Sequence, residues 1–188
     1  MANNPTIAIC GNSLAVRSEK YVTSKNIKYY AKGGAKLIEK KFFQRENSQI
    51  YNQIYNARED LIVLVEPISI EILNAMNKNK NQRNLRDLGL EIVKEMQEIS
   101  KVLVGQGKTA MIIRCELKEK NKDNRNLELN NIYEKLKNLQ NIHIDPEVIA
   151  QSNCMDDIHL GKKGERLLAV KIDEWVDNFR RAVVKTGN

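Results

Sequence analysis

The alternation of short apolar runs with helical patterns is the feature that most limits what this sequence can fold into. Five runs have the length and the Ile- and Val-rich composition of buried strands, at residues 6–10, 27–30, 61–65, 110–115 and 142–144. Apolar residues recur at three- and four-residue steps in segments 85–103, 132–139 and 168–183, which is the spacing of helices that pack on a core. Strands alternating with helices predict an α/β fold, a three-layer α/β/α sandwich around a five-stranded parallel sheet.

The length and composition favour one soluble domain spanning residues 1–188, with 41% hydrophobic residues to build its core. No apolar run is long enough to cross a bilayer, and the first residues lack the pattern of a signal peptide, so we expect no membrane association. Cys10, Cys115 and Cys154 are scattered, which suits reduced thiols and a cytosolic or nuclear protein. Only two histidines occur and no CxxC motif, so we expect neither a metal nor another cofactor.

Residues that can take part in catalysis or ligand binding follow four of the predicted strands. Gly11-Asn12-Ser13 follows the first, Lys32-Gly33-Gly34 the second and Glu66-Pro67-Ile68-Ser69 the third, and the loop after the fifth ends in Asp156-Asp157-Ile158-His159. Ligands of open α/β sheets bind outside the carboxyl ends of the strands. We therefore expect these segments to converge at one edge of the sheet.

Serine, histidine and aspartate are the residue types that acyl transfer needs. A serine hydroxyl becomes a nucleophile when a histidine takes its proton, and a carboxylate orients that histidine. Asp156 and His159 are three residues apart, so one turn can bring them together, with the second ring nitrogen facing Ser13. The amides of Ser13 and Gly34 are candidates to hold an oxyanion. Taken separately, each residue also has a structural explanation, because a serine after a strand often caps a helix and a single histidine is often a surface residue.

Three of these segments resemble the conserved blocks of the SGNH (GDSL) hydrolases. Gly11-Asn12-Ser13-Leu14 is similar to the opening Gly-Asp-Ser-Leu block, Lys32-Gly33-Gly34-Ala35 to the second block, and 156–160, with Gly164 following, to the closing Asp-x-x-His block. The resemblance implies a flavodoxin-like sheet and a serine esterase that acts on a small ester. It also implies that Ser13 is the nucleophile, His159 the base and Asp156 its orienter, with Ser13 and Gly34 donating to the oxyanion.

The sequence departs from this family at two blocks. Asn12 replaces the aspartate before the serine, and Glu66-Pro67-Ile68-Ser69 replaces a Gly-x-Asn-Asp block whose asparagine donates to the oxyanion. Losing one such donor typically costs about a hundredfold to a thousandfold in rate, which predicts a slow enzyme, one that uses Ser69 or another group as the donor, or a domain that has lost its activity. We assign substrate contacts to Asn12, Glu66 and Ser69, and expect a carboxylate at Glu66 to disfavour an oxyanion but to be able to raise the basicity of His159.

A binding module for RNA or another polyanion is the alternative function. The net charge is +7 with a pI near 9.2, and basic residues form clusters that can contact phosphates. SGNH-like domains include the RNA-binding domain of Oskar, and related domains occur in retrotransposon proteins. The candidate contacts are Lys32, Lys36, Lys40, Lys41, Lys162, Lys163 and Arg166. Acidic residues are mixed among most of the clusters, so a solvated surface explains them equally well, and a binding module has no chemical reason to keep the three triad residues.

The segment Gly105-Gln-Gly-Lys-Thr109 is reminiscent of a phosphate-binding loop. Val102 stands where the first glycine of that motif belongs, and the segment precedes a predicted strand instead of following one. We therefore predict a turn that ends a helix.

Overall fold

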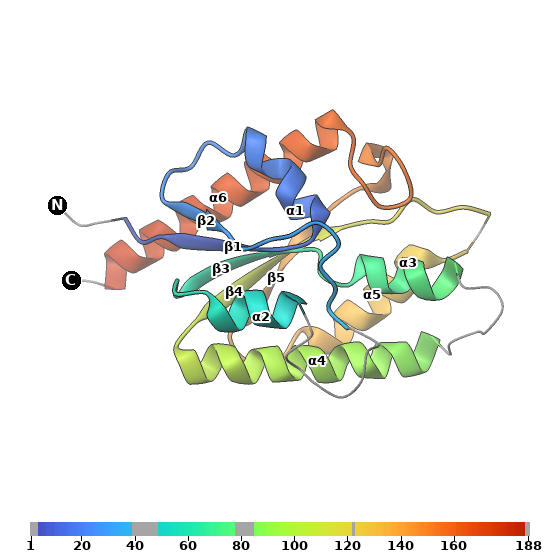
Figure 1. Ribbon diagram of the computed structural model, residues 1–188, viewed down its shortest axis with the longest axis horizontal. Coiled ribbons are helices and arrows are strands. Elements are labelled where there is room, and N and C mark those ends of the chain that lie inside the picture. The colour runs from blue at the N-terminus through green and yellow to red at the C-terminus, as the bar shows by residue number, and fades with distance from the viewer. Residues whose placement is uncertain (1–3, 39–48, 78–84, 122, 187–188) are drawn as a thin grey trace.

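In the part of the chain that the structure describes, the sheet has five parallel strands, as the alternation of elements predicts. The computed structural model describes residues 4–38, 49–77, 85–121 and 123–186 (Figure 1). The strands are β1 (Ile7–Gly11), β2 (Ile27–Tyr29), β3 (Leu61–Val65), β4 (Thr109–Cys115) and β5 (Ile142–Ile149), in the spatial order β2-β1-β3-β4-β5. Every neighbouring pair is parallel, which confirms the predicted fold class.

Helices cover both faces of the sheet. They are α1 (Ser13–Ser18), α2 (Gln49–Asn56), α3 (Ser69–Asn77), α4 (Leu85–Gln106), α5 (Arg125–Leu136) and α6 (Lys162–Thr186), with 3₁₀ turns η1 (Glu19–Tyr21) and η3 (Gln151–Asn153). Figure 1 shows α1 and α6 on one face and α2, α3, α4 and α5 on the other. All five residues of β1 are buried, as expected for a strand covered on both faces.

The helical stripes predicted from the sequence lie in the core. In α4, the buried residues include Leu88, Ile92, Met96, Ile99 and Leu103. These positions recur every three or four residues, so they lie on one side of the helix and face the sheet layer. The three-layer arrangement therefore follows from the apolar periodicity.

β5 is longer than the sequence pattern predicts, because it continues to Ile149 rather than ending at residue 144. Its pairing with β4 is interrupted after Ile112 and resumes where Arg114 faces Val148. β5 lies at the edge of the sheet, where Pro146 is tolerated because one side of the strand has no ladder to complete. Residues 145–147 are Asp-Pro-Glu, so the second half of β5 lacks the apolar run that predicts the other strands.

Residues 105–108 form a helix-ending turn, and Thr109 begins β4. α4 ends at Gln106, Gly107 has a φ of +66°, and the Lys108 amide donates to the Leu103 carbonyl over 2.8 Å. This is the left-handed turn by which many helices end. The Lys108 ammonium is buried and donates to the carbonyl oxygen of Ile54, 2.9 Å away, so it serves the packing of α2 against the sheet.

The three cysteines are free thiols, with Cys10 and Cys115 buried and Cys154 half-buried. Burial raises the pKa of the Cys10 thiol well above its ordinary value. Within the described residues, no helix combines the length and apolar character needed to cross a membrane.

Candidate active site

Ser13 lies on a tight turn between β1 and α1. The Asn12 side-chain oxygen accepts a hydrogen bond from the Leu14 amide over 3.0 Å, which caps α1. Asparagine and aspartate cap helices about equally well, so the replacement of the family aspartate by Asn12 leaves the turn intact. Gly11 has a φ of +140°, and a Cβ there would lie 2.9 Å from the Val65 carbonyl oxygen. The turn therefore requires glycine before Asn12 and Ser13.

Gln53 of α2 holds the same turn through the backbone of Gly11. The sequence pattern did not predict this role. The Gly11 amide donates to Gln53 Oε1 over 2.8 Å, and Gln53 Nε2 donates to the Gly11 carbonyl over 3.0 Å. A buried amide that satisfies both backbone groups of one residue fixes the end of β1. The available signal was a polar residue on the apolar side of α2, next to Ile54 and one turn from Ile50.

The structure brings Ser13, His159 and Asp156 together across 146 positions of sequence. Ser13 Oγ is 3.1 Å from His159 Nε2, and His159 Nδ1 is 2.9 Å from Asp156 Oδ2. Asp156 Oδ1 also accepts the amides of Ile158 and His159, at 3.0 and 2.7 Å. The three-residue spacing thus forms the turn that the sequence predicts. In this arrangement the histidine can take a proton from the serine while the carboxylate orients the ring.

The Asp156 carboxyl is held in its charged form. Partial burial acts to raise its pKa, but the hydrogen bonds from the amide and ring of His159 and from the Ile158 amide outweigh burial and lower the pKa to about 2. A carboxylate at this position accepts from His159 Nδ1 and leaves Nε2 to face Ser13.

The loop that carries His159 is anchored through its neighbour Asp157. Lys120 and Arg125 form ion pairs with the Asp157 carboxylate, at 2.5 and 3.7 Å, and the Lys118 amide donates to the Asp157 carbonyl over 3.1 Å. The hydrogen bond from Lys120 is the main reason that the pKa of Asp157 is lowered. Lys120, which precedes α5, and Arg125, its first residue, therefore stabilise the histidine loop.

The segment after β2 lies beside the Ser13 turn. The Lys32 amide donates to the Gly11 carbonyl over 3.2 Å, and the Ala35 amide donates to the Lys32 carbonyl over 3.1 Å. Gly34 has a φ of +76° and is exposed in this turn. Donation by the Ser13 and Gly34 amides to an oxyanion stays a prediction.

The residues assigned to substrate contact are buried. The exposed fractions of Asn12, Glu66 and Ser69 are 3%, 0% and 1%. The Glu66 carboxylate accepts three hydrogen bonds, from Tyr133 Oη and from the amides of Cys115 and Ile68. Ile68, at the position of the family asparagine, is fully buried and offers no side-chain donor. Among the described residues, the Ser69 hydroxyl has no hydrogen-bond partner.

The candidate RNA contacts that the structure describes are exposed. Lys32 and Lys36 lie after β2, and Lys162, Lys163 and Arg166 lie in the first turns of α6. The Arg166 guanidinium lies 5.2 Å from the centre of the Tyr21 ring, a cation–π contact within the chain. Lys40 and Lys41 lie outside the described residues. Binding of RNA stays a prediction.

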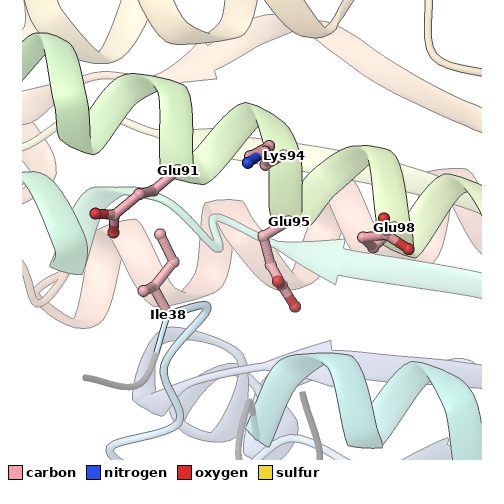
Figure 2. Close-up of a pocket in the computed structure, with 5 residues that line it drawn as sticks. All are labelled: Ile38, Glu91, Lys94, Glu95 and Glu98. Carbon is pink, nitrogen blue, oxygen red and sulfur yellow. The ribbon is translucent and has the colours of Figure 1, made fainter. Parts of the chain in front are cut away.

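A hollow elsewhere on the molecule is lined by Ile38 and by Glu91, Lys94, Glu95 and Glu98 of α4 (Figure 2). Its lining contains none of the predicted site residues. In the described part of the chain, no three His, Cys, Asp or Glu side chains are grouped so that they could hold a metal ion.

Comparison with known proteins identifies the fold. No protein-family model matches the sequence, and neither does any curated protein. Solved structures do match. A lipase from a goat rumen metagenome is 12% identical with a TM-score of 0.59, over 89% of this chain and 95% of that chain.

Two further similar structures are named as putative enzymes. An acylhydrolase from Bacteroides fragilis has a TM-score of 0.63 at 10% identity, over 96% of this chain and 90% of its own. An SGNH hydrolase from Slackia heliotrinireducens has a TM-score of 0.58 at 15% identity, over 92% and 98%. At such identities the likeness establishes a shared fold, and the three neighbours bearing that fold are named as a lipase, a putative acylhydrolase and a putative SGNH hydrolase.

Proposed function

We propose that this chain, which has an SGNH hydrolase-like fold, is a slow serine esterase acting on small esters through an acyl-enzyme on Ser13. The single observation that carries the proposal is the relay from Ser13 Oγ to His159 Nε2 and from His159 Nδ1 to Asp156 Oδ2, at 3.1 and 2.9 Å. Both distances lie within the reach of proton transfer and of ring orientation.

Acylation begins when Ser13 Oγ attacks the ester carbonyl and its proton passes to His159 Nε2. The carbonyl oxygen becomes an oxyanion, and the C–O bond to the leaving alcohol then breaks as His159 returns the proton to that alcohol. Asp156 stays charged and stabilises the imidazolium during these steps. The product is an acyl ester on Ser13 and a free alcohol.

Deacylation repeats the sequence with water. His159 removes a proton from water, the resulting hydroxide adds to the acyl carbon, and the bond to Ser13 Oγ breaks as His159 returns the proton to the serine. The acid product leaves. In both steps the Ser13 and Gly34 amides are the proposed oxyanion donors, and we expect the amide end of α1, which begins at Ser13, to favour the developing negative charge.

The slow rate in this proposal follows from the third block. Ile68 supplies no hydrogen bond from its side chain, so two backbone donors remain where the family has two amides and an asparagine. One missing donor corresponds to a rate lower by about a hundredfold to a thousandfold.

Covalent labelling tests the proposal. An organophosphonate probe should modify Ser13 of the wild type, labelling should vanish in Ser13→Ala, and it should fall strongly in His159→Ala. Matched controls are Ser152→Ala and His143→Ala, which change an exposed serine and an exposed histidine and should label like the wild type. Hydrolysis of a short-chain aryl ester should follow the same order. A folded wild type that takes no label, or equal labelling of Ser13→Ala, would reject the esterase and favour the binding module.

A further inference from the structure

Glu66 is a fully buried carboxyl group in the block where the family places its asparagine donor. It directly follows β3, and its φ of +25° is unusual for a residue with a side chain. A buried charge and an unfavourable backbone angle both cost free energy, so they persist only where surrounding contacts hold them. The hydrogen bonds of Glu66 identify the segments that keep it in this conformation.

The carboxylate of Glu66 ties three segments together. Tyr133 Oη on α5 donates to Oε2 over 2.6 Å, the Cys115 amide at the end of β4 donates to Oε1 over 3.1 Å, and the Ile68 amide donates to Oε2 over 3.2 Å. The Glu66 amide in turn donates to the Ile113 carbonyl over 2.8 Å, which extends the pairing of β3 with β4. The turn after β3 therefore has little freedom to move.

This turn is in direct contact with the turn that carries Ser13. Asn12 Nδ2 donates to the Glu66 carbonyl over 3.5 Å, while Asn12 Oδ1 caps α1 through the Leu14 amide. Gly11 of β1 pairs with Val65 of β3. A Cβ on Gly11 would collide with the Val65 carbonyl oxygen. Two successive carbonyls thus support the two residues that precede the serine.

We propose that Glu66 is a positioning residue for Ser13: its buried carboxylate fixes the turn after β3, the Glu66 carbonyl of that turn accepts from Asn12, and the Val65 carbonyl at the end of β3 packs against Gly11. The inference rests on the proposed function, because it assigns to Ser13 the role of nucleophile. Glu66 thereby supplies rigidity in a block that has lost its side-chain oxyanion donor. Reaction rates depend steeply on placement, and a shift of about 1 Å can cost on the order of a hundredfold.

The groups that face Glu66 are consistent with a structural carboxylate. Burial raises the pKa of Glu66, whereas its hydrogen bonds and the charge of Arg114, which stacks on the Tyr133 ring 4.1 Å from its centre, act against burial and favour the anion. Cys115 and Tyr133 are buried beside Glu66, and burial raises the pKa of both, so neither competes with it as an anion.

The test compares Glu66→Gln and Tyr133→Phe with Asp145→Asn. Glu66→Gln preserves volume but replaces an acceptor with a donor, and Tyr133→Phe removes only the hydroxyl. The control, Asp145, is a buried carboxyl whose partners lie on α6 and β5, namely Trp175, Lys171 and the Glu147 amide. Phosphonate labelling of Ser13 should slow by about tenfold to a hundredfold in Glu66→Gln, less in Tyr133→Phe, and stay unchanged in Asp145→Asn.

Nuclear magnetic resonance of the free protein gives a readout that does not need activity. The Leu14 amide and the Asn12 side-chain amide should shift and exchange faster in Glu66→Gln and Tyr133→Phe, but not in the control. Unchanged signals in both variants, or equal changes in Asp145→Asn, would overturn the inference. If the wild type takes no label, the esterase proposal fails, while these signals still decide whether Glu66 positions Ser13. If Glu66→Gln does not fold, Tyr133→Phe alone decides.

Discussion

At the scale of single residues, the Ser13–His159–Asp156 relay depends on which nitrogen of the histidine carries the proton. Asp156 accepts from Nδ1 and from two amides, so its two oxygens are fully committed to the turn and the ring. A neutral amide at this position would favour the wrong ring tautomer, with Nε2 protonated and unable to accept from Ser13.

Asp156→Asn should therefore lower kcat/KM for an aryl ester by up to about four orders of magnitude, while the fold is kept. Because the pKa of Asp156 is lowered to about 2, its contribution to stability is present above pH 3.8 and is lost only as the pH falls toward 2. The exposed Asp177 of α6 provides the control, Asp177→Asn, which should match the wild type. A kcat/KM within tenfold of the wild type in Asp156→Asn would contradict the relay.

At the scale of elements, the start of α6 packs closely against the loop that carries Asp156 and His159. A Cβ on Gly164 would lie 2.9 Å from both the Cβ and the carbonyl oxygen of Asn153, and 3.0 Å from the Leu160 Cβ. The Gly161 amide also donates to the Asn153 carbonyl over 2.8 Å. Helix and loop are therefore packed with no room for a methyl group.

Gly164→Ala should destabilise the protein by about 1–3 kcal/mol and slow the labelling of Ser13, because the loop backbone must move away from α6. The control is Gly105→Ala near the end of α4, where the space around the new methyl group is open and φ is not in the left-handed region. Alanine is a better helix former than glycine, so this control should gain up to about 1 kcal/mol. Urea unfolding measures the free energy of unfolding of both variants. Equal values would show that the backbone at Asn153 moves to accept a methyl group without loss of stability.

At the scale of the whole molecule, the pH dependence of stability combines carboxyl groups that are shifted in opposite directions. Burial raises the pKa of Glu66 above its ordinary 4.5, whereas hydrogen bonds lower the pKa of Asp156. A group whose pKa is raised on folding stabilises the protein most at low pH, and this contribution is lost as the pH rises through the folded-state value.

The free energy of unfolding of Glu66→Gln, relative to the wild type, should therefore increase as the pH rises from 4 toward 8, since glutamine carries no charge to bury. Chemical unfolding at a series of pH values measures this difference. Asp145→Asn is the control for removing a buried carboxyl, because Asp145 lies on β5 and its partners Trp175, Lys171 and the Glu147 amide do not contact Glu66. A difference between Glu66→Gln and wild type that stays constant with pH would mean that Glu66 titrates as it does in the unfolded chain.

The sequence by itself determined the fold class, because apolar periodicity distinguishes strands from helices and their alternation restricts the sheet to parallel pairing. It also determined the candidate nucleophile and the turn from Asp156 to His159, since these depend on local spacing. The RNA contacts and the roles of the site residues stay predictions. Only the first half of β5 could be read, because Pro146 and its polar neighbours resemble a loop unless the edge position of the strand is known.

Only the tertiary structure decided what supports the site. Gln53 and Tyr133 lie 42 and 67 positions from the backbone groups and the carboxylate that they bind, and no local pattern encodes such pairs. Glu66 was expected near the substrate because it follows a strand, yet its side chain is turned into the interior. The direction of a side chain at the end of a strand depends on partners contributed by other elements, and these partners are known only when the chain has folded.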